Sequence, residues 1–239
     1  MISIIIPARE EEQAIERTVM QFRDHLSIPH EVIVSDARSK DRTAEIARRT
    51  ADITVVFSGE KHTAAIGRND GARVASGEYF AFIDAGVDVP DPQAFFEQAL
   101  AHFEHDPNVV GVTGPQRASP DVETWADRLS YGFLNWELRF LNNVLHRGEA
   151  SGKFILVRRD AFEKIGGFRE DLVTREDGDF FYRLSKIGRT VFDPSLRIYH
   201  GARRPHALGW PRLWGIWIFN TISVLLFNKS AADDWTPIR

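Results

Sequence analysis

The strongest constraint on the fold is the alternation of short apolar runs with longer amphipathic segments over residues 2–83. The apolar runs are rich in β-branched and aromatic residues, as in buried strands, whereas the amphipathic segments repeat apolar residues every three or four positions, as helices do. We predict strands over residues 2–6, 31–35, 53–57 and 79–83, and helices over residues 11–26, 42–51 and 63–75. Because strands that alternate with helices join into a parallel sheet, the sequence predicts an α/β fold with a parallel sheet flanked by helices.

The later part of the chain continues this mixture without an internal repeat or a Pro- or Gly-rich linker, which favours one main domain. Asp41 and Asp91 are candidate N-caps of the second and fourth helices, and Asp91 precedes a proline in the first helical turn. Further helices are expected over residues 92–106, 125–146, 159–165, 176–187 and 211–228, and strands over residues 109–113, 153–157, 190–192 and 196–200.

Composition excludes several classes of protein. The 239 residues are 43% hydrophobic and 27% charged, which suits a folded globular domain and excludes a disordered chain. The absence of cysteine excludes disulfides, zinc–thiolate sites and thiol nucleophiles. A net charge of −4 is too small to predict nucleic-acid binding. The N-terminus lacks a signal-peptide pattern, and the longest apolar stretch, residues 213–227, falls short of the about 20 residues of a spanning helix, so we predict a cytoplasmic protein.

Charge is distributed unevenly along the chain. Residues 197–239 contain six basic and two acidic side chains, a balance of +4, which leaves −8 on residues 1–196. A basic C-terminal region beside an acidic body predicts contact with an anion, and chance clustering on a solvated face explains the same pattern equally well.

Two aspartates follow predicted strands, at the edge of the sheet where ligands of such folds bind. Asp36 follows the second strand, and Asp84 follows the fourth. With Asp88 four residues later, Asp84 is a candidate ligand for Mg²⁺ or Mn²⁺, which would bridge a diphosphate; the alternative is that Asp84 caps the turn 84–86. No glycine-rich phosphate loop is present, so the phosphates of a bound nucleotide need another neutralising group.

Residues 174–179 place three carboxylates near the start of a predicted helix. One interpretation is a capping box between Thr174 and Asp177, and the other is that Asp177 acts as a general base. His200 ends a predicted strand just before Arg203 and Arg204, where a structural role, a third metal ligand and a phosphate contact all remain open.

Taken together, these motifs resemble those of the family-2 glycosyltransferases over about the first 200 residues. The resemblance implies the GT-A fold, a Rossmann-like α/β fold with a mixed, mostly parallel sheet flanked by helices, here with a C-terminal apolar helical tail. The segments that carry the resemblance are SIIIPAREEE (3–12), VIVSDARSKDRT (32–43), GRNDGA (67–72), ASGEY (75–79), FIDAG (82–86), IGGF (165–168) and EDGDF (176–180). No one of these segments is specific, but their order and spacing together are. This chain departs from the family pattern at Glu10, at Ala37 and Arg38, and at Gly86, which stands where the family has a second aspartate.

The resemblance implies an inverting transfer of a sugar from a nucleoside-diphosphate sugar to a hydroxyl or phosphate of a glycan, glycolipid or polyprenyl phosphate. It implies Asp177 as catalytic base. Donor-binding residues would be Pro7, Ala8, Arg9, Glu11, Asp36, Lys61, Arg68 and Asp84. Glu176, Arg203 and Arg204 would lie toward the acceptor, and Asp84, Asp88 and His200 would hold Mg²⁺ or Mn²⁺. Retaining transfer, a nucleotidyltransferase and an inactive nucleotide-sugar-binding module stay open as alternatives.

The same resemblance divides the chain into a domain over residues 1–205 and a C-terminal aromatic helix within residues 206–239. Residues 1–113 would bind the nucleotide sugar, and residues 114–205 would supply the acceptor side and the base. The C-terminal segment contains Trp210, Trp214, Trp217 and Phe219 near basic residues, which suits a helix in a membrane interface. Packing on the core or in a homodimer would bury the same aromatic residues, and the apolar character all round the helix favours packing.

Overall fold

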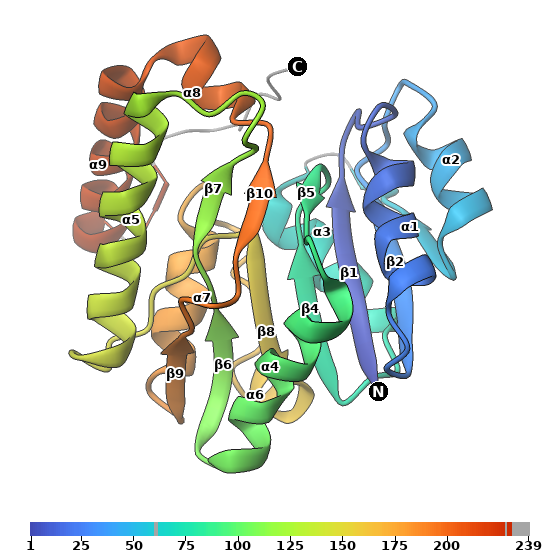
Figure 1. Ribbon diagram of the computed structural model, residues 1–239, viewed down its shortest axis with the longest axis horizontal. Helices are drawn as coiled ribbons and strands as arrows, with labels where there is room; N and C mark the ends of the chain where they lie inside the picture. Colours follow the sequence, from blue (N-terminus) through green and yellow to red (C-terminus); the bar gives the residue numbers. More distant parts are fainter. Residues whose placement is uncertain (60–61, 228, 231–239) are drawn as a thin grey trace.

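The computed structural model describes residues 1–59, 62–227 and 229–230, and its centre is a mixed sheet (Figure 1). Within these residues, seven strands pair in the order β3-β2-β1-β4-β8-β6-β9. They are β1 (Ile2–Ala8), β2 (His30–Asp36), β3 (Ile53–Val56), β4 (Tyr79–Ile83), β6 (Val109–Thr113), β8 (Phe154–Arg158) and β9 (Arg189–Phe192). All neighbours are parallel except β8, which runs antiparallel to β4 and β6. The predicted α/β fold with a mostly parallel sheet is confirmed.

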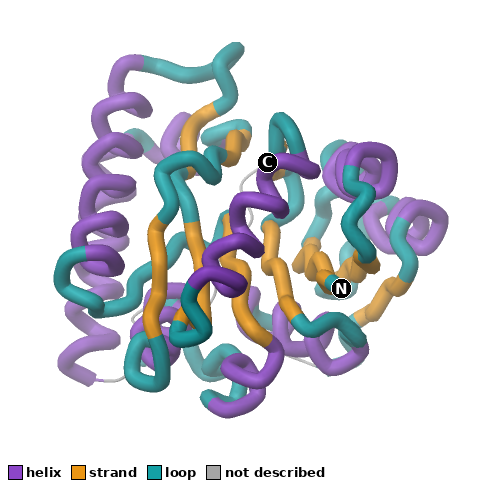
Figure 2. The backbone as a smooth tube through the Cα atoms, turned by 60° about the horizontal axis from the view of Figure 1, so that its bottom comes forward, coloured by secondary structure: helices purple, strands orange, loops and turns teal. Residues whose placement is uncertain are grey.

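Helices cover both faces of this sheet, and Figure 2 shows the strands as one row between them. The helices are α1 (Ile15–His25), α2 (Thr43–Thr50), α3 (Ala64–Val74), α4 (Pro92–His105), α5 (Trp125–Asn143), α6 (Arg159–Lys164), α7 (Glu176–Leu184), α8 (Arg203–Leu208) and α9 (Trp210–Phe227). Alternate residues of β1 point to opposite faces, so Ile4 packs in the cluster that includes α1 and α4, while Ile5 packs in the cluster that includes α3 and α7. Gly71 lets α3 lie close to β1, because a Cβ there would come within 2.4 Å of Ile5.

A second, smaller sheet lies beyond the central one and was not predicted as a unit. Its strands are β5 (Val87–Asp88), β10 (Ile198–His200) and β7 (Gln116–Ala118), paired in the order β5-β10-β7. Strands of two or three residues carry too few positions to show the alternation by which a strand is recognised. This sheet brings His200, at the end of β10, beside Val87, just past the end of β4.

Helix starts differ in how well the sequence predicts them. Asp91 caps α4 as predicted, since its carboxylate accepts a hydrogen bond from the Ala94 N–H at 3.1 Å. The N-cap of α2 is Arg42 rather than Asp41, and the Asp41 carboxylate instead accepts from the Thr43 N–H at 3.0 Å. α1 begins at Ile15, later than predicted, because the Glu11 N–H bonds the Thr43 hydroxyl and holds the preceding turn to another loop.

The inner side of α9 packs against α5. Tyr131, Trp210 and Leu213 are buried together in a cluster that also contains Ala118 and Ala202. The rings of Tyr131 and Trp210 lie 4.9 Å apart in an edge-to-face arrangement. Within the described residues, no helix combines the length and apolarity needed to cross a membrane.

Candidate active site

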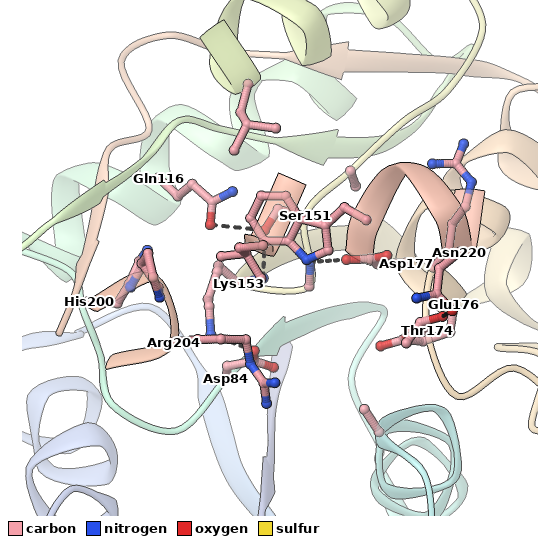
Figure 3. Close-up of a pocket in the computed structure, with 18 of the residues that line it drawn as sticks. Asp84, Gln116, Ser151, Lys153, Thr174, Glu176, Asp177, His200, Arg204 and Asn220 are labelled. Carbon is pink, nitrogen blue, oxygen red and sulfur yellow. Dashed lines mark hydrogen bonds and ion pairs between the residues drawn. The ribbon is translucent and has the colours of Figure 1, made fainter. Parts of the chain in front are cut away.

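A pocket of about 780 Å³ opens beyond the carboxyl ends of β1 and β4, next to the start of α7. Figure 3 shows Asp177 and His200 on opposite sides of this pocket, with Lys153 and Asp84 between them. Most of the residues singled out from the sequence line it, although they come from distant segments: Pro7, Ala8, Arg9, Glu11, Arg68, Asp84, Glu176, Asp177, His200, Arg203 and Arg204.

Three predicted site residues are not placed in this lining. Asp36 lies at the end of β2, beside Ala8, but it is fully buried; its Oδ2 accepts from the Ser39 N–H, and its Oδ1 has no hydrogen-bond partner among the described residues. Asp88 forms an ion pair with Arg17 at 3.1 Å and borders a separate hollow, apart from the pocket that Asp84 lines. Lys61 lies outside the described residues.

Arg68 connects the two acidic motifs. From α3, its Nη1 donates to Glu176 Oε1 at 2.7 Å, while its Nη2 donates to Asp84 Oδ1 at 3.0 Å and to the Gly152 carbonyl at 3.3 Å. The side chain is only 2% exposed. Burial opposes its charge, but the surrounding carboxylates outweigh that effect and raise the pKa of Arg68, so it is a permanently charged bridge.

Asp84 has both carboxylate oxygens paired. Oδ1 accepts from Arg68, and Oδ2 accepts from Lys153 Nζ at 3.0 Å. Burial raises the pKa of this carboxyl, but the charges of Lys153 and Arg68 outweigh burial and hold the pKa below its usual value. Asp84 is therefore an anchor for cationic side chains, not the simple turn cap that was the alternative from sequence.

Asp177 is oriented by backbone N–H groups. Its Oδ2 accepts from the Gly152 N–H at 2.6 Å, and its Oδ1 accepts from the Gly178 N–H at 2.8 Å. The capping-box interpretation is wrong, because Thr174 donates its hydroxyl to Asn220 at 2.9 Å and the N-cap of α7 is Arg175, in the left-handed conformation at φ 65°. The carboxylate is held in one position at the pocket wall, as a general base needs to be.

Two glycines leave room for charged side chains at the pocket wall. A Cβ on Gly152 would lie 2.4 Å from Arg68 Nη2, and one on Gly178 would lie 2.0 Å from Glu149 Oε1. Both contacts are shorter than van der Waals distance, so any side chain at these positions would displace Arg68 or Glu149.

The sequence analysis missed several charged or polar groups of the pocket, among them Glu149, Lys153 and His62. Glu149 accepts from Arg175 at 2.7 Å; burial and the charge of Asp177 raise its pKa to about 7. The pKa of Glu176 is also raised to about 7, by burial and by Asp177, against the opposing charge of Arg68. Glu149, Lys153 and His62 do not belong to any recognised sequence motif. The one signal for Lys153 was its position at the start of a predicted strand.

The donor set around Asp84 does not fit a cation held by carboxylates. Gly86 stands at the second acidic position of the motif, with φ +79°, and a Cβ there would lie 3.7 Å from Arg203 Nη2. His200 Nδ1 accepts from the Ala202 N–H at 3.2 Å, so the neutral ring carries its proton on Nε2 and presents an N–H rather than a lone pair. Among the described residues, no three carboxylate or histidine groups converge on one point.

Basic side chains gather on this side of the pocket instead. Arg203 donates to both oxygens of Glu11, at 2.8 and 3.1 Å, and so links α8 to the turn after β1. Arg204 lies beside it, where burial and the charge of Arg203 lower its pKa. His200 Nε2 is buried and has no hydrogen-bond partner among the described residues. Together with Lys153, these groups suit a bound anion.

Comparison with known proteins identifies a family model and a curated relative that match this chain. The family model described as "Glycosyl transferase family 2" matches residues 3–166. The chain is 29% identical over 221 residues to the succinoglycan biosynthesis protein ExoA of Rhizobium meliloti (strain 1021), an alignment that covers 88% of this chain and 65% of that protein. The chain therefore spans a little under two thirds of the length of this curated relative.

Two solved structures share the fold. The mannosyltransferase PcManGT from Pyrobaculum calidifontis, in complex with GDP-Man and Mn²⁺, has a TM-score of 0.69 at 21% identity, covering 86% of this chain and 59% of that one. The glucosyl-3-phosphoglycerate synthase from Mycobacterium tuberculosis, in complex with Mn²⁺, UDP and glucosyl-3-phosphoglycerate, has a TM-score of 0.62 at 21% identity, covering 96% and 80%. The predicted GT-A fold is confirmed.

Proposed function

This chain belongs to glycosyl transferase family 2, and we propose that it transfers a sugar from a nucleoside-diphosphate sugar to an acceptor, with Asp177 as the general base. The observation that carries the proposal is one hydrogen-bonded chain through the pocket. Asp84 bonds Arg68, Arg68 bonds the Gly152 carbonyl, and the Gly152 N–H bonds Asp177. These hydrogen bonds fix the position of Asp84, on the proposed donor side, relative to that of Asp177, the proposed base.

Residues 1–113 are proposed to bind the donor. Pro7 and Ala8 at the end of β1, and Arg9 and Glu11 in the turn after it, line the part of the pocket where the base and ribose would lie. Asp36 Oδ1, buried and without a partner among the described residues, suits an N–H group of the nucleotide base. The GDP-Man and UDP held by the two structural neighbours support a nucleotide at this edge of the sheet.

Residues 114–205 are proposed to supply the acceptor side, with inversion at the anomeric carbon. The acceptor oxygen attacks that carbon as its bond to the diphosphate oxygen breaks, and the acceptor proton passes to Asp177. The nucleoside diphosphate leaves with the electron pair. Glu176 acts through Arg68 as a positioning residue, because its carboxylate is occupied by that guanidinium.

The leaving diphosphate needs positive charge to stabilise it. Mn²⁺ in both structural neighbours supports the prediction of Mg²⁺ or Mn²⁺ from sequence, but the donor set of this chain does not assemble around such an ion. We therefore assign this role to Lys153, Arg203, Arg204 and the Nε2–H of His200, all of which line the pocket. No step of the proposed reaction passes through a metal.

A nucleotidyltransferase is the first competing function. That class needs a glycine-rich, basic loop after the first strand, whereas the turn after β1 is acidic and its Glu11 N–H is bonded to Thr43. The second competing function is that of an inactive binding module. Such a module would have no need for a carboxylate that two backbone N–H groups hold at the pocket wall, as they hold Asp177.

A donor panel tests the proposal. We expect one of the UDP-, GDP- or dTDP-sugars to raise the melting temperature by an amount that grows with the logarithm of its concentration over its dissociation constant. We also expect NMR of the transfer product to show inverted anomeric configuration. Failure of every nucleotide sugar to shift the melting temperature would contradict donor binding. A retained configuration would contradict the role of Asp177.

A further inference from the structure

Helix α5 exposes an apolar stripe that the pocket does not use. Trp125, Leu129, Phe133, Trp136 and Phe140 follow one another at spacings of three or four residues, so they share one face of the helix. All five side chains are exposed, Trp125 by 78% and Trp136 by 58%. Exposed large aromatic residues in such a row mark a contact surface rather than chance exposure.

Helix α9 extends this surface. Ile218, Phe219, Ile222, Leu226 and Phe227 are exposed on it. The two helices meet where the ring of Phe133 lies 5.7 Å from that of Trp214, and Trp136 and Phe140 continue the aromatic row along α5. We call these ten exposed residues of α5 and α9 the aromatic face.

The exposed charged residues of α5 and α9 beside the aromatic face are basic, and Glu123, just before α5, pairs with Arg128 at 2.7 Å through a side chain that is only 8% exposed. Arg128 and Arg139 are exposed on α5, and Arg212 is exposed on α9. The acidic residues of α5 do not join them, because Asp127 is buried and Glu137 is half-buried and lines the pocket; α9 has no acidic residue. Tryptophan, aliphatic and arginine side chains without exposed acids are typical of a helix face that rests on anionic lipid headgroups.

The aromatic face is continuous with the candidate active site. Ile218 and Ile222 are exposed on the face and also line the pocket. On the opposite wall, α5 contributes Leu134, Leu138 and Leu141. The pocket lining therefore includes apolar side chains of both helices and extends from the aromatic face to Asp177.

α9 is fixed to the segment that carries the base. Thr174 donates its hydroxyl to Asn220 at 2.9 Å, and both side chains are buried. Ser230, just beyond α9, accepts from the N–H groups of Val173 and Thr174 at 3.0 and 3.1 Å. The helix that carries half of the aromatic face thus also sets the position of the segment leading to Asp177.

We propose that the aromatic face rests on an anionic lipid surface and that the acceptor is lipid-linked. This inference rests on the proposed transfer reaction and names its acceptor class. The acceptor's apolar chain lies between α5 and α9, and its polar head reaches Asp177. The leucine and isoleucine side chains that α5 and α9 add to the pocket offer no hydrogen-bond partners to a free glycan, whereas they suit an apolar chain. A two-fold contact between two copies would set the arginines of one face against those of the other.

Vesicle sedimentation with the full chain tests the lipid surface. We expect the protein to pellet with phosphatidylcholine vesicles that contain phosphatidylglycerol, and less with phosphatidylcholine alone or at high salt. The double variant Trp136→Ser/Phe219→Ser has two fewer aromatic side chains to bury in the lipid. It should therefore lower the coefficient for partition of the protein into the vesicles at least about tenfold. The matched control is Val56→Ser/Val74→Ser, which removes exposed apolar side chains elsewhere and should leave binding unchanged.

Other results would overturn the inference. Protein that stays in the supernatant at low salt contradicts a lipid surface, and a dimer that Trp136→Ser/Phe219→Ser dissociates would assign the face to a second copy. A water-soluble acceptor used as well as a polyprenyl phosphate or glycolipid contradicts the acceptor class. The donor-induced rise in melting temperature separates the two claims, because it survives if only the lipid inference fails and is lost if donor binding fails.

Discussion

The guanidinium of Arg68 lies 2.7 Å from the carboxylate of Glu176, across 108 positions of sequence. One arginine on α3 thereby ties the start of α7, which carries the proposed base, to Asp84 at the end of β4. The donor side and the base side of the pocket are therefore one electrostatic unit.

Removing the Arg68 guanidinium should destabilise the protein and abolish transfer. Arg68→Met leaves the carboxylates of Asp84 and Glu176 without their shared cation, and breaking a buried ion pair in this way costs about 3–5 kcal/mol. Urea unfolding measures the change. The matched control is Arg73→Met on the same helix, whose side chain is 61% exposed, and it should change stability by less than about 1 kcal/mol. Equal stability of the two variants would show that the bridge contributes nothing.

A methyl group at Gly152 should damage the site. In Gly152→Ala the new Cβ would lie 2.4 Å from Arg68 Nη2 and 3.3 Å from Asp177 Oδ2, so the bridge or the base has to move. We expect a lower kcat together with a lower melting temperature. Gly132→Ala is the control, since nothing lies within 4 Å of its Cβ and alanine stabilises a helix by about 0.5–1 kcal/mol. A fully active Gly152→Ala enzyme would contradict the described geometry.

The strands of the fold and the position of Asp84 in the site could be predicted from sequence. Hydrophobic periodicity fixes the strands, and in a wound sheet Asp84 necessarily follows β4 at the binding edge. The orientation of β8 does not follow from its own sequence, because an antiparallel strand has the same apolar pattern as a parallel one. Lys153, which enters the pocket just before β8, was missed for this reason.

The interpretation of residues 174–177 shows a different limit. Thr174 and Asp177 have the spacing of a capping box, but the Thr174 hydroxyl bonds Asn220 on α9. The local spacing predicted that the Thr174 hydroxyl would bond within the first turn of α7, but it bonds a residue 46 positions away in sequence. A capping box does form at Thr124 and Asp127, where the Thr124 hydroxyl donates to the Asp127 carboxylate itself.

The contribution of Glu149 to stability should fall as pH rises from about 5 to 8. Burial and the charge of Asp177 raise the pKa of Glu149 to about 7 from its ordinary 4.5. The contribution of a carboxyl with a raised pKa is fully present below 4.5 and is lost as pH rises through about 7, because ionisation is then harder in the folded state. Glu149→Gln should flatten this fall in urea unfolding at pH 5 and pH 8. An unchanged slope would show that Glu149 ionises as freely as in the unfolded chain.

Transfer should persist in enzyme stripped of metal and assayed with chelator, because basic side chains are proposed to stabilise the diphosphate. Lys153→Met should lower kcat by about 100-fold, since it removes one pre-organised positive group. Lys164→Met, on exposed α6 surface, is the control and should be silent. Activity that disappears in chelator and returns with Mn²⁺ would contradict this prediction and would support the divalent cation predicted from sequence.

The central claim is that Asp177 removes the acceptor's proton, and one comparison tests it most directly. Asp177→Asn keeps an oxygen that accepts from Gly152 but loses the ability to take a proton, whereas Asp179→Asn changes the neighbouring carboxylate, which pairs with Arg183. Measuring kcat beside the donor-induced melting shift, we predict that Asp177→Asn lowers transfer about 1,000-fold with the shift intact and that Asp179→Asn keeps its transfer rate. Undiminished transfer by Asp177→Asn would contradict the account.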